Sequence, residues 1–411
     1  MVRKFIFWLH LVCGVVAGIS IGIMCLTGTI LAFEKELAAW DEREARQIEA
    51  PPAGATRITI DEAQRKLREA HPDAKPATMV VLNDPQAAWS FPGARGVAGY
   101  YVNPHSGEVR RPDATTVGQF MQTMLTWHRY LGFSGTDSRP RGKWINGTCN
   151  LAFCLLAITG LYLWMPRNWS VRSVKAVTLF NWRLTGRARD FNWHNSIGLW
   201  TAPILIVLTL TAVPISFQWG GRLINSLTGT PPAAAPGAAA PPAVEISAPP
   251  AGTPLLSQDA LLAIVQREFP AWTTITLRLD VPAAGGGTGL PTRVPSGLST
   301  ASSASPATGR ETRATRPVTF TIREASSWPR TANTTVLVHP QTAEILQRTG
   351  YEELPAAQQV RAWTRYLHTG EALGWGGQLI AGLACLGGCV LVWTGFTLAA
   401  RRFSGLVRGR D

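Results

Sequence analysis

Seven histidines are spread over the 411 residues, and four of them stand at or just before long stretches without charged residues. These four are His10, His128, His194 and His368. A neutral imidazole is a common metal ligand, and two imidazoles on opposite sides of a flat group can hold a haem iron. The chain has no C-x-x-C-H motif, so the chemistry that these residues suggest is non-covalent binding of b-type haem.

Four stretches free of Asp, Glu, Lys and Arg must position these histidines. They cover residues 5–33, 144–166, 191–221 and 372–400, and have 29, 23, 31 and 29 residues. About 20 apolar residues suffice for a helix to cross a bilayer. The charged fraction of 16% is also below the roughly 25% of soluble domains. The sequence therefore predicts an α-helical membrane protein with a bundle of four transmembrane helices.

The net charge of +13 is typical of a nucleic-acid-binding protein or of a membrane protein with basic cytoplasmic loops. Its distribution favours the second interpretation, because residues 1–4, 167–190 and 401–411 together carry +2, +5 and +3, or +10. Lys and Arg concentrate on the cytoplasmic side. We therefore expect both termini to be cytoplasmic, the long loops to lie outside, and no nucleic-acid partner.

This topology sorts the four histidines into two pairs. His10 and His194 open helices that run outward, so they lie at the cytoplasmic side. His128 and His368 precede helices that run inward, so they lie at the outer side. Ionisable residues in a membrane are costly and usually functional. We therefore predict two haem b groups, with His10 and His194 as ligands of one iron and His128 and His368 as ligands of the other.

A Thr-Gly pair recurs in three of the four helices, at Thr27-Gly28, Thr159-Gly160 and Thr394-Gly395, and the fourth helix has Thr211-Ala212. Seventeen residues separate His10 from Thr27, and also His194 from Thr211, which is about 25 Å of helix. Each pair should thus be level with histidines of other helices. Gly28, Gly160 and Gly395 could then contact a porphyrin, or simply allow close helix packing.

The segments before the second and fourth membrane helices resemble each other: Trp127-His128-Arg129-Tyr130-Leu131 and Trp363-Thr364-Arg365-Tyr366-Leu367-His368. In this alignment the second histidine is offset by four residues, which is one helical turn. Arg129 and Arg365 could pair with haem propionates or be ordinary surface arginines.

The two outer segments also repeat a plan of one helix followed by strands. Aligning their last turns, Asn103-Pro104 and His339-Pro340, indicates an internal duplication. The first half of the chain is predicted to contain a membrane helix (5–33), a small α+β domain (34–117), an interfacial helix with the second membrane helix (118–166) and a basic cytoplasmic loop (167–190). The second half is predicted to contain the third membrane helix (191–221), an Ala/Pro/Gly linker (222–254) and a second α+β domain (255–350) with a disordered insertion (283–316). An interfacial helix with the fourth membrane helix (351–400) and a cytoplasmic tail (401–411) complete the chain.

These motifs resemble the PepSY-associated transmembrane family of bacterial inner-membrane proteins. The resemblance rests on His10, Thr27-Gly28, Trp127-His128-Arg129, His194, Leu367-His368 and Trp393-Thr394-Gly395, in that order. It implies that the outer α+β domains are periplasmic PepSY-like domains. It also implies an oxidoreductase that uses its haems to reduce a ferric siderophore outside the membrane, with electrons from a cytoplasmic flavoprotein or from quinol.

Two other functions stay open on the sequence alone. PepSY domains also suggest a non-enzymatic module, such as a periplasmic sensor or peptidase regulator. Transport of a metal or siderophore is the third possibility. Transporters typically bind their substrate at a pair of broken membrane helices, whereas here only Pro203 and Pro214, both in one helix, interrupt a membrane span. The sequence indicates no further catalytic residue and no specific siderophore.

Overall fold

A computed structural model describes residues 1–52, 54–94, 97–112, 116–166, 169–231, 254–279 and 316–407. The chain divides into two compact units. The helical unit contains Met1–Glu34, Met121–Thr230 and Val360–Asp411, and the sheet unit contains Lys35–Phe120 and Pro231–Gln359. The chain therefore passes twice from the helical unit into the sheet unit and back.

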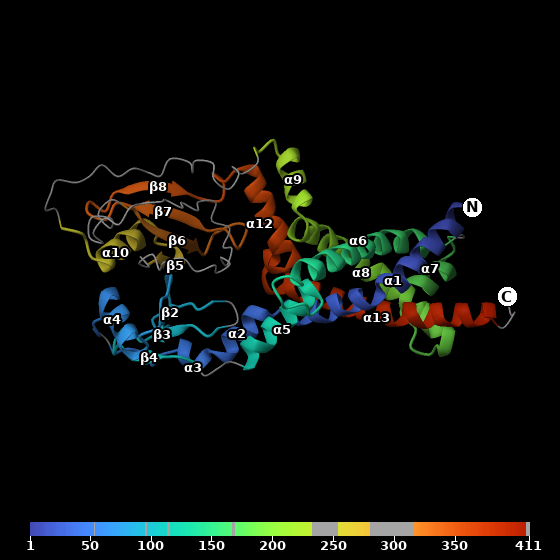
Figure 1. Ribbon diagram of the computed structural model, residues 1–411, viewed down its shortest axis with the longest axis horizontal. Helices are drawn as coiled ribbons and strands as arrows, with labels where there is room; N and C mark the ends of the chain where they lie inside the picture. The colour runs from blue at the N-terminus through green and yellow to red at the C-terminus, as the bar shows by residue number, and fades with distance from the viewer. Residues whose placement is uncertain are drawn as a thin grey trace. The chain divides into compact units, whose positions relative to one another are not determined.

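Four long helices form the helical unit (Figure 1): α1 (Val2–Leu31), α6 (Arg139–Trp164), α8 (Gly186–Ser216) and α13 (Gly374–Val407). All four are long and apolar enough to cross a membrane. α1 packs on α6 and α13, and α8 packs on the same two helices. The result is the predicted four-helix bundle, in which α1 and α8 are diagonally opposite.

Four shorter helices flank the bundle helices: α5 (Thr116–Tyr130), α7 (Val171–Thr178), α9 (Gln218–Leu227) and α12 (Ala356–His368). α5 turns into α6 through Leu131 and Gly132, whose φ angles are +52° and +84°. α12 turns through Gly370, with φ +77°, into the short 3-10 helix η1 (Glu371–Leu373) and then α13. These tight turns place the ends of α5 and α12 against the bundle.

The third membrane helix and the following linker differ from the predicted boundaries 191–221 and 222–254. α8 ends at Ser216, Phe217 is extended, and α9 begins at Gln218. A Cβ on Gly220 would lie 2.8 Å from the Pro214 Cα atom, so the absence of a side chain there permits the sharp turn. The charge-free composition continues across this break as far as Gly221, so composition alone could not reveal the break.

The sheet unit contains two helices that begin at side-chain caps. The Thr59 hydroxyl accepts from the backbone N–H of Glu62 at the start of α4 (Ile60–Ala70), and the Ser257 hydroxyl accepts from Ala260 at the start of α10 (Gln258–Glu268). Such caps satisfy N–H groups that have no partner within the helix. The short helices α2 (Glu34–Asp41) and α3 (Arg43–Arg46) precede α4.

Eight antiparallel strands form one continuous sheet in the order β4-β3-β2-β1-β5-β6-β7-β8. The strands are β1 (Thr78–Leu82), β2 (Trp89–Phe91), β3 (Tyr100–Val102), β4 (Val109–Arg110), β5 (Trp272–Arg278), β6 (Val318–Glu324), β7 (Thr334–Val338) and β8 (Ile345–Thr349). The first four strands and the last four come from the two repeats. They join where β1 pairs with β5, with Val80 opposite Thr276.

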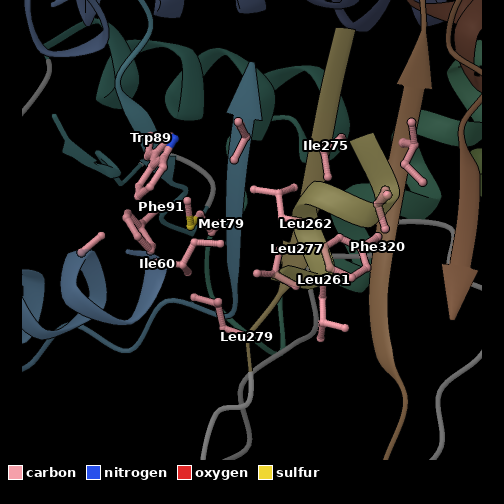
Figure 2. Close-up of a cluster of buried hydrophobic side chains, with 14 of the residues drawn as sticks. Ile60, Met79, Trp89, Phe91, Leu261, Leu262, Ile275, Leu277, Leu279 and Phe320 are labelled. Carbon is pink, nitrogen blue, oxygen red and sulfur yellow. The ribbon is translucent and has the colours of Figure 1, made fainter. Parts of the chain in front are cut away.

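The two repeats therefore share one sheet and one core, whereas the sequence predicts two separate small domains. The side chains of α4 and α10 pack with alternating residues of the strands (Figure 2), including Ile60, Phe91, Leu261, Ile275 and Phe320. The two helices also touch at their starts, because both Asp259 carboxylate oxygens accept from the Ile60 N–H at 3.0 and 3.1 Å. Pairing of β1 with β5 could not be expected from patterns within either repeat.

The turns that close the two repeats have the same hydrogen-bond pattern. Asn103 Oδ1 accepts from the N–H groups of the residues two and three positions later, at 2.9 and 3.3 Å. At the equivalent place, His339 Nδ1 accepts from the N–H groups of Gln341 and Thr342 at 3.1 and 3.2 Å. The two turns that the sequence aligns therefore have equivalent side-chain acceptors, Asn103 Oδ1 and His339 Nδ1. His339 thus stabilises a turn. Most of the predicted insertion 283–316 lies outside the described residues.

Candidate functional site

The four histidines of the helical unit meet in two pairs, in the combination expected from the topology. The ring centroids of His10 (α1) and His194 (α8) are 6.4 Å apart. Those of His128 (α5) and His368 (α12) are 6.3 Å apart. Each pair thus takes one imidazole from each half of the chain. His71, His105 and His339 belong to the sheet unit.

Each histidine is hydrogen-bonded to a threonine of the Thr-Gly motifs. The Nδ1 atoms of His10, His128 and His194 lie 2.9 Å from the Oγ1 atoms of Thr159, Thr27 and Thr394, respectively. His368 Nδ1 lies 3.3 Å from Thr211 Oγ1. The four threonines were expected to be level with these histidines, and the structure brings them into direct contact.

The direction of these hydrogen bonds fixes the imidazole tautomer. A threonine hydroxyl has a single hydrogen, and each of the four donates it to a carbonyl of its own helix at 2.6 or 2.7 Å. Each Oγ1 can therefore only accept from the imidazole, so Nδ1 carries the proton. The carbonyls of Met24 and Leu208, 3.1 and 2.9 Å from the Nδ1 atoms of His128 and His368, require the same protonation. The Nε2 lone pair of each histidine is then the one available to a metal.

The spacing within each pair suits a single metal ion between two imidazoles. A ligating imidazole nitrogen lies about 2.0–2.1 Å from its metal and about 1.1 Å from its own ring centroid, so two opposed imidazoles have centroids about 6.3 Å apart. The observed separations are 6.4 and 6.3 Å. The described residues contain no group of three or more His, Cys, Asp or Glu side chains placed to hold a metal ion. The donor set is therefore two nitrogens per site, which is the axial set of a bis-histidine haem.

The glycines after the threonines face the imidazoles. A Cβ on Gly28, Gly160 or Gly395 would lie 3.3, 3.4 or 3.5 Å from the Cε1 atom of the neighbouring histidine. Only at Gly28 would this contact be tight, because 3.4–3.5 Å is an ordinary van der Waals separation. The fourth motif has Ala212 in this position, and its threonine has the longest hydrogen bond of the four, 3.3 Å.

Two asparagines in α6 join this network, and the sequence analysis did not select them. Asn146 Nδ2 donates to the carbonyl of His128 at 2.8 Å, which anchors the end of α5. Asn150 Nδ2 donates to the carbonyl of Thr209 at 2.9 Å and so links α6 to α8. Both are buried. Their signal in the sequence is two amide side chains one turn apart within an otherwise apolar span.

A charged cluster lies next to the pair of His10 and His194. Asp190 in the first turns of α8 is completely buried, and its carboxylate is 2.9 Å from Arg189 and 3.2 Å from Arg401 of α13. The Arg189 guanidinium lies 5.4 and 5.3 Å from the ring centroids of Trp193 and Trp393. Since these tryptophans directly precede His194 and Thr394, the cluster ties together the two helix segments that hold one ligand.

Arg129 and Arg365, the predicted propionate partners, occupy equivalent places near the other pair. Arg129 follows His128, and its guanidinium lies 5.5 Å from the centroid of the Tyr130 ring. Arg365 is three residues before His368, in the last turn of α12. Both arginines therefore lie within one helical turn of His128 or His368 along the chain.

The model of the PepSY-associated TM region family matches residues 7–402, which is nearly the whole chain. The chain belongs to the PepSY-associated TM region family. Together with the four helices long enough to cross a bilayer, this membership identifies a multi-pass membrane protein. No curated protein matches the chain in sequence.

Proposed function

We propose that this protein is a bacterial inner-membrane reductase that binds two haem b groups and transfers electrons across the membrane to a ferric siderophore. The observation that carries the proposal is the arrangement of two imidazole pairs, each with Nδ1 bound to a threonine and centroids 6.3–6.4 Å apart. His10 and His194 would hold the haem iron on the cytoplasmic side. His128 and His368 would hold the one on the periplasmic side.

The protein's own contribution is to hold four ligands in place in a dry bundle. Bound between two histidines, haem iron exchanges single electrons. The threonines fix the imidazole tautomer and hold the rings, so that each Nε2 lone pair would be available to the iron. The two levels are separated by 17 residues of α1, about 25 Å, which suits two redox centres spaced across one bilayer.

The proposed direction of transfer rests on the basic cytoplasmic segments. They support a topology with both termini in the cytoplasm and with the PepSY-like α+β repeats in the periplasm. A cytoplasmic flavoprotein or membrane quinol would supply electrons to the inner site. A ferric siderophore would accept them near the outer site. Reduction to Fe(II) weakens binding by hard oxygen ligands, so the iron is released for uptake.

Purification from haem-replete cells tests this function. The wild-type protein should contain about two haem b groups per chain, measured by pyridine haemochrome absorbance against protein concentration. His10→Ala and His368→Ala should each lose one haem, and the two single-haem spectra should differ. His71→Ala, in the sheet unit, is the matched control and should retain both haems.

A colourless wild-type protein would refute the proposal. It would favour the alternatives of a periplasmic sensor or peptidase regulator, or of a metal or siderophore transporter. Retention of both haems by His10→Ala and His368→Ala would refute the ligand assignment.

A further inference from the structure

The outer end of the helical unit is strongly basic, although the rule that Lys and Arg concentrate on the cytoplasmic side predicts no excess of basic residues there. Seven basic residues and three acidic ones lie there outside the cytoplasmic segments, a net charge of +4. They are Arg129, Arg139, Arg141, Lys143, Arg222, Arg361 and Arg365, with Glu34, Asp137 and Glu371. Lys and Arg usually accumulate on the cytoplasmic side, so a different cause must account for this basic rim.

One stripe of the rim leads directly to an outer histidine. Arg139, Lys143 and Asn146 follow one another at positions i, i+4 and i+7 of α6, which places them on one helix face. Asn146 Nδ2 donates to the carbonyl of His128. The Arg139 guanidinium lies 5.6 Å from the centroid of the Tyr130 ring. The stripe therefore runs from the first turn of α6 to the backbone of a proposed ligand.

Two guanidinium groups gather at the same tyrosine, since Arg129 is 5.5 Å from the Tyr130 centroid. Two positive charges are thus concentrated around one aromatic ring, and like charges repel each other. An anion between or beside them would relieve this repulsion, and guanidinium groups bind carboxylates with paired hydrogen bonds.

Unsatisfied polar atoms lie in the same stripe. Arg139 Nε and Asn146 Oδ1 are buried without a hydrogen-bond partner among the described residues. The Asn146 residue is 93% buried, because only 7% of its surface is exposed. Buried polar atoms normally have partners. The Arg139 Nε–H could donate to an anionic oxygen, whereas the Asn146 oxygen can only accept, from a donor such as water.

We propose that the basic rim binds the substrate as an anion, namely a ferric chelate with net negative charge and carboxylate or catecholate oxygens. This inference rests on the proposed function. Two haem propionates would lower the rim's charge from +4 to about +2, so positive charge remains for the substrate. The haems, when bound, would supply the single electron that reduces chelated Fe(III) to Fe(II).

The test compares chelates of different charge on the purified holoprotein in nanodiscs. The haems are reduced anaerobically and mixed in a stopped-flow instrument with ferric citrate, a neutral ferric trihydroxamate or a cationic ferric trihydroxamate. Steering by a charged surface changes association rates roughly 10-fold or more. Arg139→Gln/Lys143→Gln should slow oxidation by ferric citrate about 10-fold and change the rate with the cationic chelate less than twofold. High salt should reduce the difference from wild type.

Two further measurements separate the possible outcomes. Redox-inert gallium(III) citrate should bind wild type more tightly than the double variant in calorimetry. Arg172→Gln/Lys175→Gln, which removes the same charge from the cytoplasmic loop, should behave as wild type. Equal slowing with all three chelates would overturn the proposal, as would salt-independent rates. A double variant that changes only the haem content or the midpoint potential would also overturn it, because the rim would then bind the haem propionates and not the substrate. A protein without haem would instead refute the proposed function.

Discussion

Replacing Thr159 by valine should weaken haem binding at the proposed inner site more than the equivalent change at any other of the four threonines weakens its own site. Thr159 Oγ1 is 2.9 Å from His10 Nδ1, and among the described residues no other acceptor lies within hydrogen-bond distance of this nitrogen. At the outer sites a backbone carbonyl shares the role. Leu208 O, at 2.9 Å from His368 Nδ1, is even closer than Thr211 Oγ1 at 3.3 Å.

The size of the effect follows from this difference. Valine has the shape of threonine without the hydroxyl, so it leaves the buried His10 N–H without a partner. That costs about 1–3 kcal/mol, and 1.4 kcal/mol corresponds to tenfold in affinity. Haem at the proposed inner site should therefore bind roughly 5- to 140-fold more weakly. Thr211→Val should change the outer site less than about threefold, because the Leu208 carbonyl still accepts the hydrogen bond.

The assay measures haem transfer to excess apomyoglobin from protein carrying His368→Ala, which isolates the inner site. Thr159→Val should accelerate the transfer, and Thr159→Ser should restore the wild-type rate. Thr209→Val is the matched control, because this buried hydroxyl donates only within α8. If Thr159→Val released haem no faster than Thr209→Val, threonine would not hold the ligand. Equal effects of Thr159→Val and Thr211→Val, the latter measured with His10→Ala, would refute the role of the carbonyl.

Three further changes have defined consequences. Gly28→Val should remove the outer haem selectively, because even a Cβ atom would lie 3.3 Å from His128 Cε1; a normal pyridine haemochrome value would contradict this. Asp190→Ala should destabilise the helical unit by about 1 kcal/mol, because the arginines that lose their carboxylate are 34% and 44% exposed and remain hydrated. The thermal midpoint in detergent should fall, and an unchanged midpoint would show that the cluster is not stabilising. Asp259→Ala should lower the stability of the sheet unit by about 1 kcal/mol, because it removes the acceptor for the Ile60 N–H. Proteolysis of the outer segments should then be faster while both haems are retained. Loss of haem would instead link this contact to the helical bundle.

The sequence predicts the bundle and the pairing of the histidines well, because both depend on one-dimensional signals. Charge-free stretches identify the helices, and the number of membrane crossings decides which end each histidine occupies. The separation of His10 from Thr27 by 17 residues likewise gives the level of the threonines. These inferences need only helix rise and orientation.

Contacts between elements could not be predicted in the same way. A Thr-Gly pair is common where membrane helices pack, so nothing in the sequence shows that the hydroxyl accepts from Nδ1. The junction of β1 with β5 depends on strand edges that come from repeats about 200 residues apart, with Thr78 opposite Arg278. The amides of Asn146 and Asn150 gain their roles only from the carbonyls that they reach on other helices.

The threonine–histidine bonds have a consequence for how the site is assembled. Each one joins residues of the same half: His10 to Thr159 and His128 to Thr27 in the first half, and the corresponding bonds of α8 with α13 and α12 in the second. The two imidazoles of each pair, in contrast, come from different halves. Each half thus orients two imidazoles by its own hydrogen bonds, and a pair forms only where the two halves meet. A single repeat could complete such a site only by meeting a second copy of itself.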